Sequence, residues 1–169
     1  MLAERLLEEL NEQLRYEYES AHYYLAIAAY FKAEDLEGFA HFFEIQAEEE
    51  RFHAQKFANF IDEMGERVVI KALGEPRNEF DSIADAIEYA LHHEESVTRR
   101  IYKLMDIAQE ESCYPAISML QWFVDEQVEE EATMDGLLKK VERIGENGNG
   151  IYMLDSELAQ RTFTPPAGE

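Results

Sequence analysis

Two residue types that bind metal ions stand three positions apart in the stretch EIQAEEERFHAQKF, residues 44–57. They are the carboxylate of Glu50 and the imidazole of His53. In a helix this spacing places both side chains on one face. Helical bundles use a Glu-x-x-His pair of this kind to hold a metal ion. Both residues interrupt what otherwise reads as the apolar face of a helix, and this raises the question of what lies opposite them.

Polar residues interrupt three other apolar stripes at a similar depth. Alternate steps of four and three residues, the repeat of a helix in a bundle, select one apolar stripe in each of four segments. Each stripe carries its polar members near its middle, about equally far from the nearest turn, so the members should meet at one level. In chain order the interruptions are Glu17, then Glu50 with His53, then Glu94, then Gln127 with Glu130.

Four carboxylates at one level of an apolar core require a positive partner. Each buried unpaired charge costs several kcal/mol, and repulsion between like charges adds to this. No Lys or Arg lies on any of the four stripes, whereas two divalent cations would balance four carboxylates. The pattern therefore predicts a dinuclear metal centre. An oxygen-rich donor set with one imidazole suits iron or manganese, with zinc as a competitor. The alternative is a non-catalytic bundle whose buried acids are protonated.

Long uninterrupted helices must position these residues, because Gly and Pro number only 8 and 4 in 169 residues. Short connections make the first two and the next two helices antiparallel hairpins. The segment 65–80 is long enough to run the length of a helix of roughly 40 Å and so joins the hairpins by one crossover. The predicted helices lie at about residues 3–33, 36–64, 82–111 and 115–144, with a short one at about 150–160.

The expected fold class is therefore all-α: a four-helix bundle with one long crossover between the second and third helices and a short fifth C-terminal helix. We expect a single domain, in which residues 1–145 form the bundle and residues 146–169 form the C-terminal helix and tail.

Composition narrows the possible partners and the compartment. The chain has 37 acidic and 15 basic residues and a formal net charge of −22, which opposes binding to nucleic acid or anionic membranes and favours attracting cations. The single cysteine, Cys113, excludes an intramolecular disulfide and any multi-cysteine metal site. The N-terminal sequence MLAERLLEEL lacks the apolar core of a signal peptide, and no apolar run approaches a membrane span. We expect a soluble cytoplasmic protein.

Four motifs resemble the ferritin family, specifically its non-haem prokaryotic type, over nearly the whole chain. They are RYEYESAHYYLA, AEEERFHA, HEE and WFVDEQVEEE, and each contains one of the polar interruptions. The resemblance implies a shell of 24 identical subunits. Such a shell oxidises Fe(II) to Fe(III) with dioxygen or peroxide and stores the ferric mineral. A soluble di-iron oxidase or peroxidase that stores no iron is the alternative.

The resemblance also implies roles for individual residues. The ligands of the first iron would be Glu17, Glu50 and His53, and those of the second would be Glu50, Glu94 and Glu130, so that Glu50 bridges the two ions. Gln127 is similar to the family's glutamine near the second iron, a weak neutral ligand or a hydrogen-bond donor to a ligand. A third, inner iron position would use Glu49, Glu126 and Glu129, with Glu130 shared. Tyr24 would take part in electron transfer to oxygen, the alternative being an ordinary core tyrosine.

Two departures separate the chain from haem-binding bacterioferritins, which repeat Glu-x-x-His in the fourth helix and place a methionine beside the second-helix motif. The corresponding residues here are Gln127-Val128-Glu129-Glu130 and Phe52, so we expect no haem. The remaining histidines fall off the apolar stripes and are expected to face solvent: His22, His41, His92 and His93.

Overall fold

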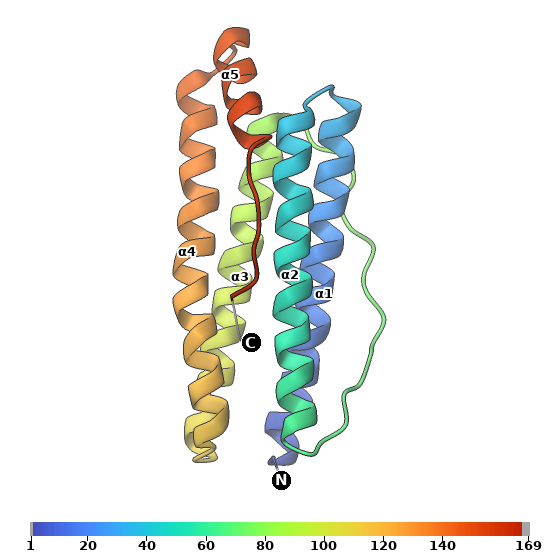
Figure 1. Cartoon of the computed structure of the whole chain (residues 1–169), viewed down its shortest axis with the longest axis vertical. Coiled ribbons are helices and arrows are strands. Elements are labelled where there is room, and N and C mark those ends of the chain that lie inside the picture. Colours follow the sequence, from blue (N-terminus) through green and yellow to red (C-terminus); the bar gives the residue numbers. More distant parts are fainter. Residues whose placement is uncertain (1, 167–169) are drawn as a thin grey trace.

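The computed structural model describes residues 2–166, and these form five helices and no strand. The helices are α1 (Glu4–Ala33), α2 (Glu37–Glu63), α3 (Ile83–Glu110), α4 (Tyr114–Ile144) and α5 (Gly148–Leu158). The first four run side by side as two antiparallel hairpins, α1 with α2 and α3 with α4, and α5 packs against one end of α2 (Figure 1). The all-α bundle with one crossover and a short fifth helix is confirmed.

Side-chain caps fix where two of the helices begin. The hydroxyl of Ser82 accepts a hydrogen bond of 3.0 Å from the backbone N–H of Asp85 at the start of α3. The side chain of Asn147 accepts one of 3.2 Å from the N–H of Gly150 at the start of α5. Such caps satisfy N–H groups that have no partner within the helix. Because Asn147 is the cap, α5 begins and ends two residues earlier than predicted.

The helix that carries the Glu-x-x-His pair is capped by another helix. No side chain next to the start of α2 caps it. Instead the Asp155 carboxylate of α5 accepts a hydrogen bond of 2.9 Å from the N–H of Phe39. The two backbones touch at Gly38, where an added Cβ would lie 1.7 Å from the carbonyl oxygen of Asp155. Only glycine fits there, and its contact docks α5 on α2.

The crossover between α2 and α3 is fixed to the side of α1 (Figure 1). The side-chain amide of Asn11 donates to the carbonyl of Arg67 at 3.4 Å, and its oxygen accepts from the N–H of Val69 at 2.7 Å. About two turns further along α1, Glu19 accepts a hydrogen bond from the N–H of Gly74 at 2.9 Å. The crossover therefore lies in one place along the outside of the bundle, away from the face between α2 and α4.

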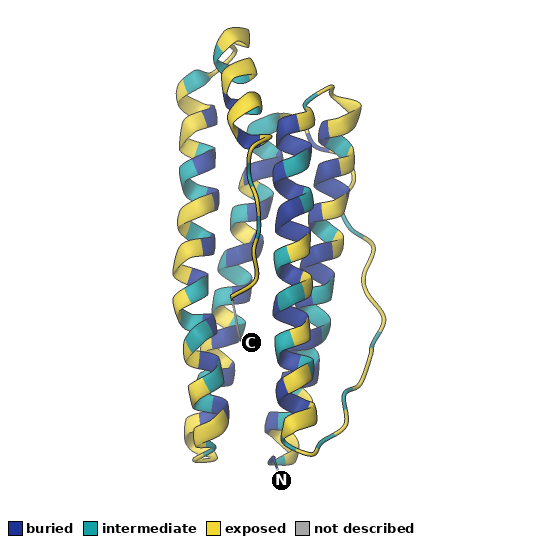
Figure 2. Ribbon diagram, in the orientation of Figure 1, coloured by how far each residue is buried: buried dark blue, intermediate teal, exposed yellow. Residues whose placement is uncertain are grey.

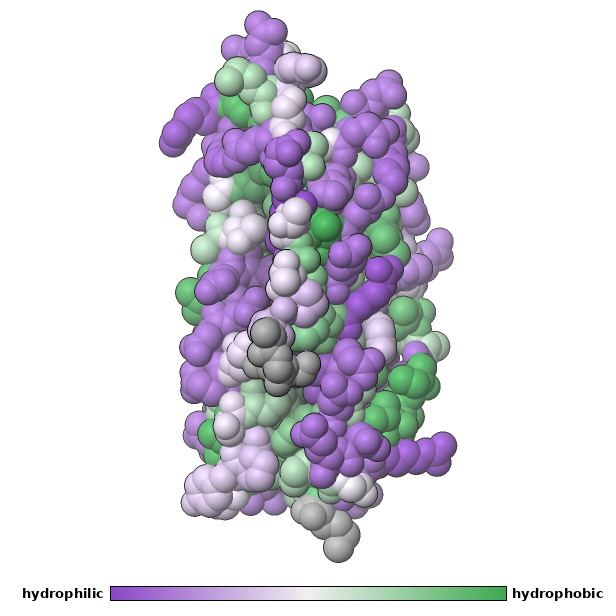
Figure 3. Space-filling model, viewed as in Figure 1, coloured by the Kyte–Doolittle hydropathy of each residue, from purple (hydrophilic) through white to green (hydrophobic). Residues whose placement is uncertain are grey.

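One face of the molecule is mainly polar. Hydrophilic side chains predominate on the face in Figure 3, with a group of hydrophobic ones over the crossover, where Val69, Ile70 and Leu73 are exposed. Within residues 2–166, none of the helices combines the length and the hydropathy needed to cross a membrane.

The interior is divided into two apolar clusters. One surrounds Phe31 and Phe43 near the α1–α2 turn, and the other surrounds Leu14 and Phe57 towards the opposite end. Buried residues face inward along all four long helices (Figure 2). Between the clusters the buried side chains are polar, so the apolar core stops at the level where the sequence predicts a metal centre.

Candidate metal centre

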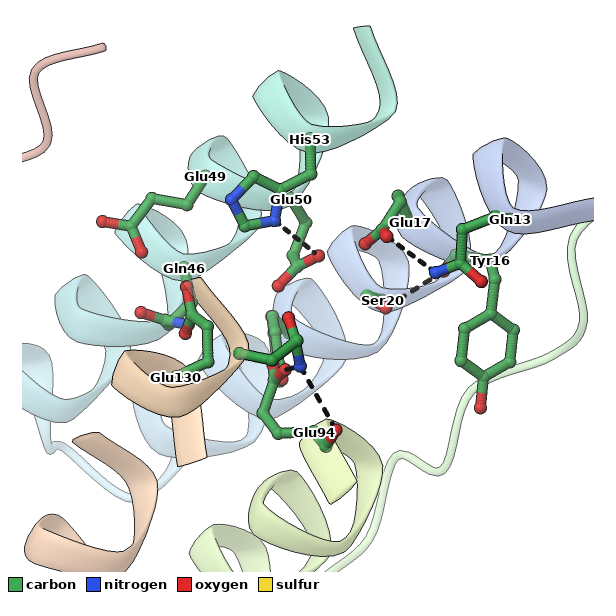
Figure 4. A network of polar contacts seen from close by, with 12 residues as sticks. Gln13, Tyr16, Glu17, Ser20, Gln46, Glu49, Glu50, His53, Glu94 and Glu130 are labelled. Carbon is green, nitrogen blue, oxygen red and sulfur yellow. Dashed lines mark hydrogen bonds and ion pairs between the residues drawn. The ribbon is translucent and has the colours of Figure 1, made fainter. Parts of the chain in front are cut away.

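All four long helices contribute a carboxylate to one point in the core. Glu17 comes from α1, Glu50 and His53 from α2, Glu94 from α3 and Glu130 from α4, and each is at most 5% exposed. In Figure 4 these side chains point from their helices towards a common space. The convergence follows from the heptad-like spacing, because each residue lies on its helix's inward stripe about equally far from a turn.

Two of the three donor groups found among the described residues share Glu50. In the first, one ligand atom each from Glu17, Glu50 and His53 lies within 4.8 Å of the others. In the second, the same holds for Glu50, Glu94 and Glu130. Glu50 can therefore contribute one oxygen to each of two neighbouring cations, and the two groups match a dinuclear site.

The metal-free centre leaves carboxylate oxygens unsatisfied. Neither oxygen of Glu50 nor the Oε2 atom of Glu17 has a hydrogen-bond partner, and the Nδ1 atom of His53 is 3.5 Å from Glu50. Burial raises the pKa of Glu50 well above 4.5, with a further rise from the charges of Glu94, Glu17 and Glu130. Burial and the charge of Glu130 likewise raise the pKa of Glu94. Cations would satisfy these oxygens and remove the repulsion, so the donor set fits two metal ions.

Hydrogen bonds from neighbouring residues orient two of the carboxylates. The amide of Gln13 donates to Glu17 at 2.7 Å and is itself held by the Arg100 guanidinium, whose Nε–H donates to its oxygen at 2.9 Å. The amide of Gln46 donates to Glu130 at 2.9 Å. Such partners fix the direction of a metal ligand. The sequence analysis missed Gln13, although its position one turn before Glu17 on the same helix face was a usable signal.

Tyr24 and Gln127 both hold Glu94. The Tyr24 hydroxyl donates to one oxygen of Glu94, and the Gln127 amide donates to the other at 3.1 Å. Burial, and then the charge of Glu94, raise the pKa of Tyr24 well above 10, so this phenol stays protonated at neutral pH. In the metal-free molecule Gln127 therefore acts as a hydrogen-bond donor to the Glu94 carboxylate.

The residues predicted for a third metal position are only partly brought together. Glu126 forms a donor group with His53 and Glu130, again within 4.8 Å. Glu49 is instead paired with Arg161, and burial raises its pKa to about 7 even though the guanidinium opposes the rise. Glu129 is exposed and belongs to none of the three donor groups found among the described residues.

The prediction that the other four histidines face solvent is wrong for His93 and holds only in part for His41. His22 and His92 are exposed, His41 is half-buried and His93 is buried. The Nε2 atom of His93 lies 2.7 Å from the Ser20 hydroxyl, and its ring stacks on Tyr16. Burial lowers its pKa to about 4 and keeps it neutral. His93 is buried because α1 packs against the side of α3, which the inward stripe of α3 alone does not indicate.

A four-helix bundle that carries a carboxylate from each helix and a Glu-x-x-His pair in its core is similar to the class of helical bundles that hold metal ions between their helices. The family model described as a ferritin-like domain matches residues 7–144. The chain belongs to the ferritin family.

Individual relatives agree with this assignment. A bacterial non-heme ferritin of Staphylococcus aureus strain MRSA252 is 46% identical over 163 residues, which cover 96% of this chain and 98% of the relative. An engineered closed form of the Archaeoglobus fulgidus ferritin superposes with a TM-score of 0.96 at 40% identity, covering 97% of this chain and 100% of the other. A structure described as an open pore ferritin from the same archaeon gives 0.95 at 40% identity, with 96% and 100% covered.

Proposed function

We propose that this ferritin-family chain is a ferroxidase that stores the iron it oxidises. Iron storage is the function that membership of the family supports. The oxidation step is supported by one observation above all: two donor groups share Glu50, and neither oxygen of Glu50 has a hydrogen-bond partner. Such a site holds two Fe(II) ions side by side as substrates, where both can react with one oxidant molecule.

The proposed reaction needs two electrons. Each Fe(II) loses one electron. These two electrons, together with two protons, reduce dioxygen to hydrogen peroxide or reduce hydrogen peroxide to water. Glu17, Glu50 and His53 would bind one ion, and Glu50, Glu94 and Glu130 the other. Because Glu50 carries a raised pKa when no metal is bound, binding of the ions also displaces protons from the centre.

Two residues beside Glu94 have proposed supporting roles. Gln127 is neutral where a carboxylate would add a charge, so the second ion is held less tightly and can move onward as Fe(III). Tyr24 donates a hydrogen bond to Glu94, so its ring would lie near a metal ion held by Glu94. We propose that Tyr24 takes part in electron transfer from iron to the oxidant: Fe(II) returns any electron that the tyrosine gives up, so the two-electron balance is unchanged.

The proposal extends to a third position and to assembly. Glu126 and Glu130, with Glu49 beside them, would receive iron leaving the centre. The sequence also assigned Glu129 to this position, but Glu129 lies outside the donor groups, so the position rests on the other residues. We propose a shell of 24 copies. Large apolar side chains exposed on the single chain, including Ile70, Tyr152 and Met153, supply surfaces for subunit contacts.

The test is to add Fe(II) stepwise in air to purified metal-free protein and to count the iron that co-elutes with it on a sizing column. Storage predicts retention far above the two or three ions per chain that the named ligands can hold, on a very large particle. Saturation at those few ions on a small oligomer would instead mean a di-iron oxidase or peroxidase. A bundle with protonated acids and no metal function would retain no stoichiometric iron.

A further inference from the structure

The segment after α5 folds back along α2. The carbonyl oxygen of Arg161 lies 2.8 Å from the Nε2 atom of His41. The guanidinium carbon of Arg161 lies over the ring of Phe42, 4.2 Å from the ring centroid. Two residues on, Phe163 packs edge-on against Phe52, with the ring centroids 5.9 Å apart. In Figure 1 this segment descends from α5 alongside α2, on the side towards α3 and α4. We call residues 159–166 the C-terminal strap.

The strap brings a positive charge to the face of α2 that carries the metal ligands. The Nη2 atom of Arg161 donates to the Oε2 atom of Glu49 at 2.9 Å, and the two side chains are only 21% and 14% exposed. The Nη1 atom of Arg161 is buried without a hydrogen-bond partner. An ion pair removed from water in this way requires defined geometry on both sides, unlike a mobile surface pair.

Glu49 stands between the strap and the third donor group. It directly precedes Glu50 on α2, and the charges of Glu130 and Glu126 act on its carboxylate. Those two residues form the donor group with His53. Figure 4 shows the Glu49 carboxylate on the same side as His53 and Glu130, so a divalent ion held in that group would repel the guanidinium that now neutralises Glu49. The metal ion and Arg161 therefore compete for one carboxylate.

We propose that Arg161 is a positioning residue that controls occupancy of the third metal position. Without metal, Arg161 neutralises Glu49 and the strap lies on α2. When a cation binds Glu126 and Glu130, it takes Glu49 as a ligand, and the released guanidinium loosens the strap. The role of the third position in iron handling rests on the proposed function. The competition between a cation and Arg161 for Glu49 depends only on metal binding.

The test uses Zn²⁺, which binds the same ligand types without redox chemistry, in isothermal titration of the metal-free protein. Arg161→Gln should bind the third Zn²⁺ about tenfold more tightly, within the usual range for coupling between two groups. The first two ions should be unaffected. Arg143→Gln is the matched control, because Arg143 is exposed and its loss changes the net charge equally. Equal third-ion affinities in Arg161→Gln, Arg143→Gln and the unmodified protein would overturn the proposal.

A second pair of variants separates the strap from the charge. Phe163→Ala removes the ring contact with Phe52 while Arg161 remains, and it should also strengthen the third Zn²⁺ site. Glu49→Gln should weaken that site. In a chain that already carries Glu49→Gln, adding Arg161→Gln should not change the affinity for the third Zn²⁺ further. Additive effects of Glu49→Gln and Arg161→Gln on the third-ion affinity would contradict competition for a shared carboxylate.

Hydrogen exchange reports the movement directly. In the unmodified protein, peptides covering the strap should exchange faster when Zn²⁺ saturates the third position, and in Glu49→Gln they should not respond. Unchanged exchange in the unmodified protein would overturn release of the strap. These readouts are independent of the ferroxidase proposal: failure to oxidise Fe(II) would leave the Zn²⁺ results standing, and equal Zn²⁺ affinities would leave iron oxidation untouched.

Discussion

Replacing Glu50 by glutamine should change metal binding and stability in opposite directions. The substitution keeps the side-chain volume but removes a charge that both donor groups share. Loss of a hydrogen-bond partner of a metal ligand costs about 10- to 100-fold in affinity, so loss of a shared ligand should cost at least about 100-fold at each of the two positions. That is at least about 2.7 kcal/mol for each ion.

The metal-free protein should instead gain stability at neutral pH. Burial and neighbouring carboxylates raise the pKa of Glu50 above its unfolded value of 4.5. The folded chain then holds a proton that the unfolded chain releases, so the stability that this group contributes is present below pH 4.5 and is lost as pH rises through the folded pKa. Each pKa unit of elevation accounts for about 1.4 kcal/mol. Because glutamine does not titrate, Glu50→Gln removes this loss of stability.

Both effects can be measured on one sample. Zn²⁺ titration gives the affinities, and the midpoint of thermal unfolding between pH 5 and pH 8, with metal chelated, gives the stability. Glu48→Gln is the control, since Glu48 is exposed on the same helix and should change neither quantity. If Glu50→Gln lowered the unfolding temperature of the metal-free protein at pH 8, the view of the centre as a set of unsatisfied carboxylates would be wrong. Unchanged Zn²⁺ affinity would refute the shared-ligand assignment.

Two other substitutions test single contacts. Tyr24→Phe removes the hydrogen bond to Glu94 and should cost about 1 kcal/mol of stability. It should also slow Fe(II) oxidation at saturating iron in stopped-flow absorbance, beyond the weakening of Zn²⁺ affinity that loss of the hydrogen bond to Glu94 brings, and an unchanged rate would exclude Tyr24 from electron transfer. Gly38→Ala places a Cβ against the backbone of Asp155 and should cost about 1–3 kcal/mol in thermal unfolding. Gly136→Ala, a helical site where a Cβ has free space, should instead stabilise by up to about 1 kcal/mol.

The main features of the fold and the convergence of the centre could be predicted from periodicity. Glu17, Glu94 and Glu130 lie together because each occupies an inward stripe at a similar distance from a turn, and that distance can be counted in the sequence. The assignment of these residues as iron ligands remains a proposal that the titrations above test.

What escaped prediction depends on packing between elements far apart in the sequence. Arg100 reaches Gln13 from another helix, and this pairing is not indicated by the spacing of residues within either helix. His93 was expected outside because its position on α3 says nothing about how closely α1 approaches. Arg161 follows a short helix whose docking depends on Gly38, so its pairing with Glu49 could not be predicted from local sequence pattern.

The cap supplied by Asp155 also sets an order in which the subunit can be completed. During synthesis α2 appears early, but the carboxylate that satisfies its first turn appears only after all four long helices have been made. Until then α2 lacks a cap that is typically worth about 1 kcal/mol. The helix that holds Glu50 and His53 thus acquires its final stability only in a chain translated through α5, so a truncated product would carry the ligands on a helix with a frayed first turn.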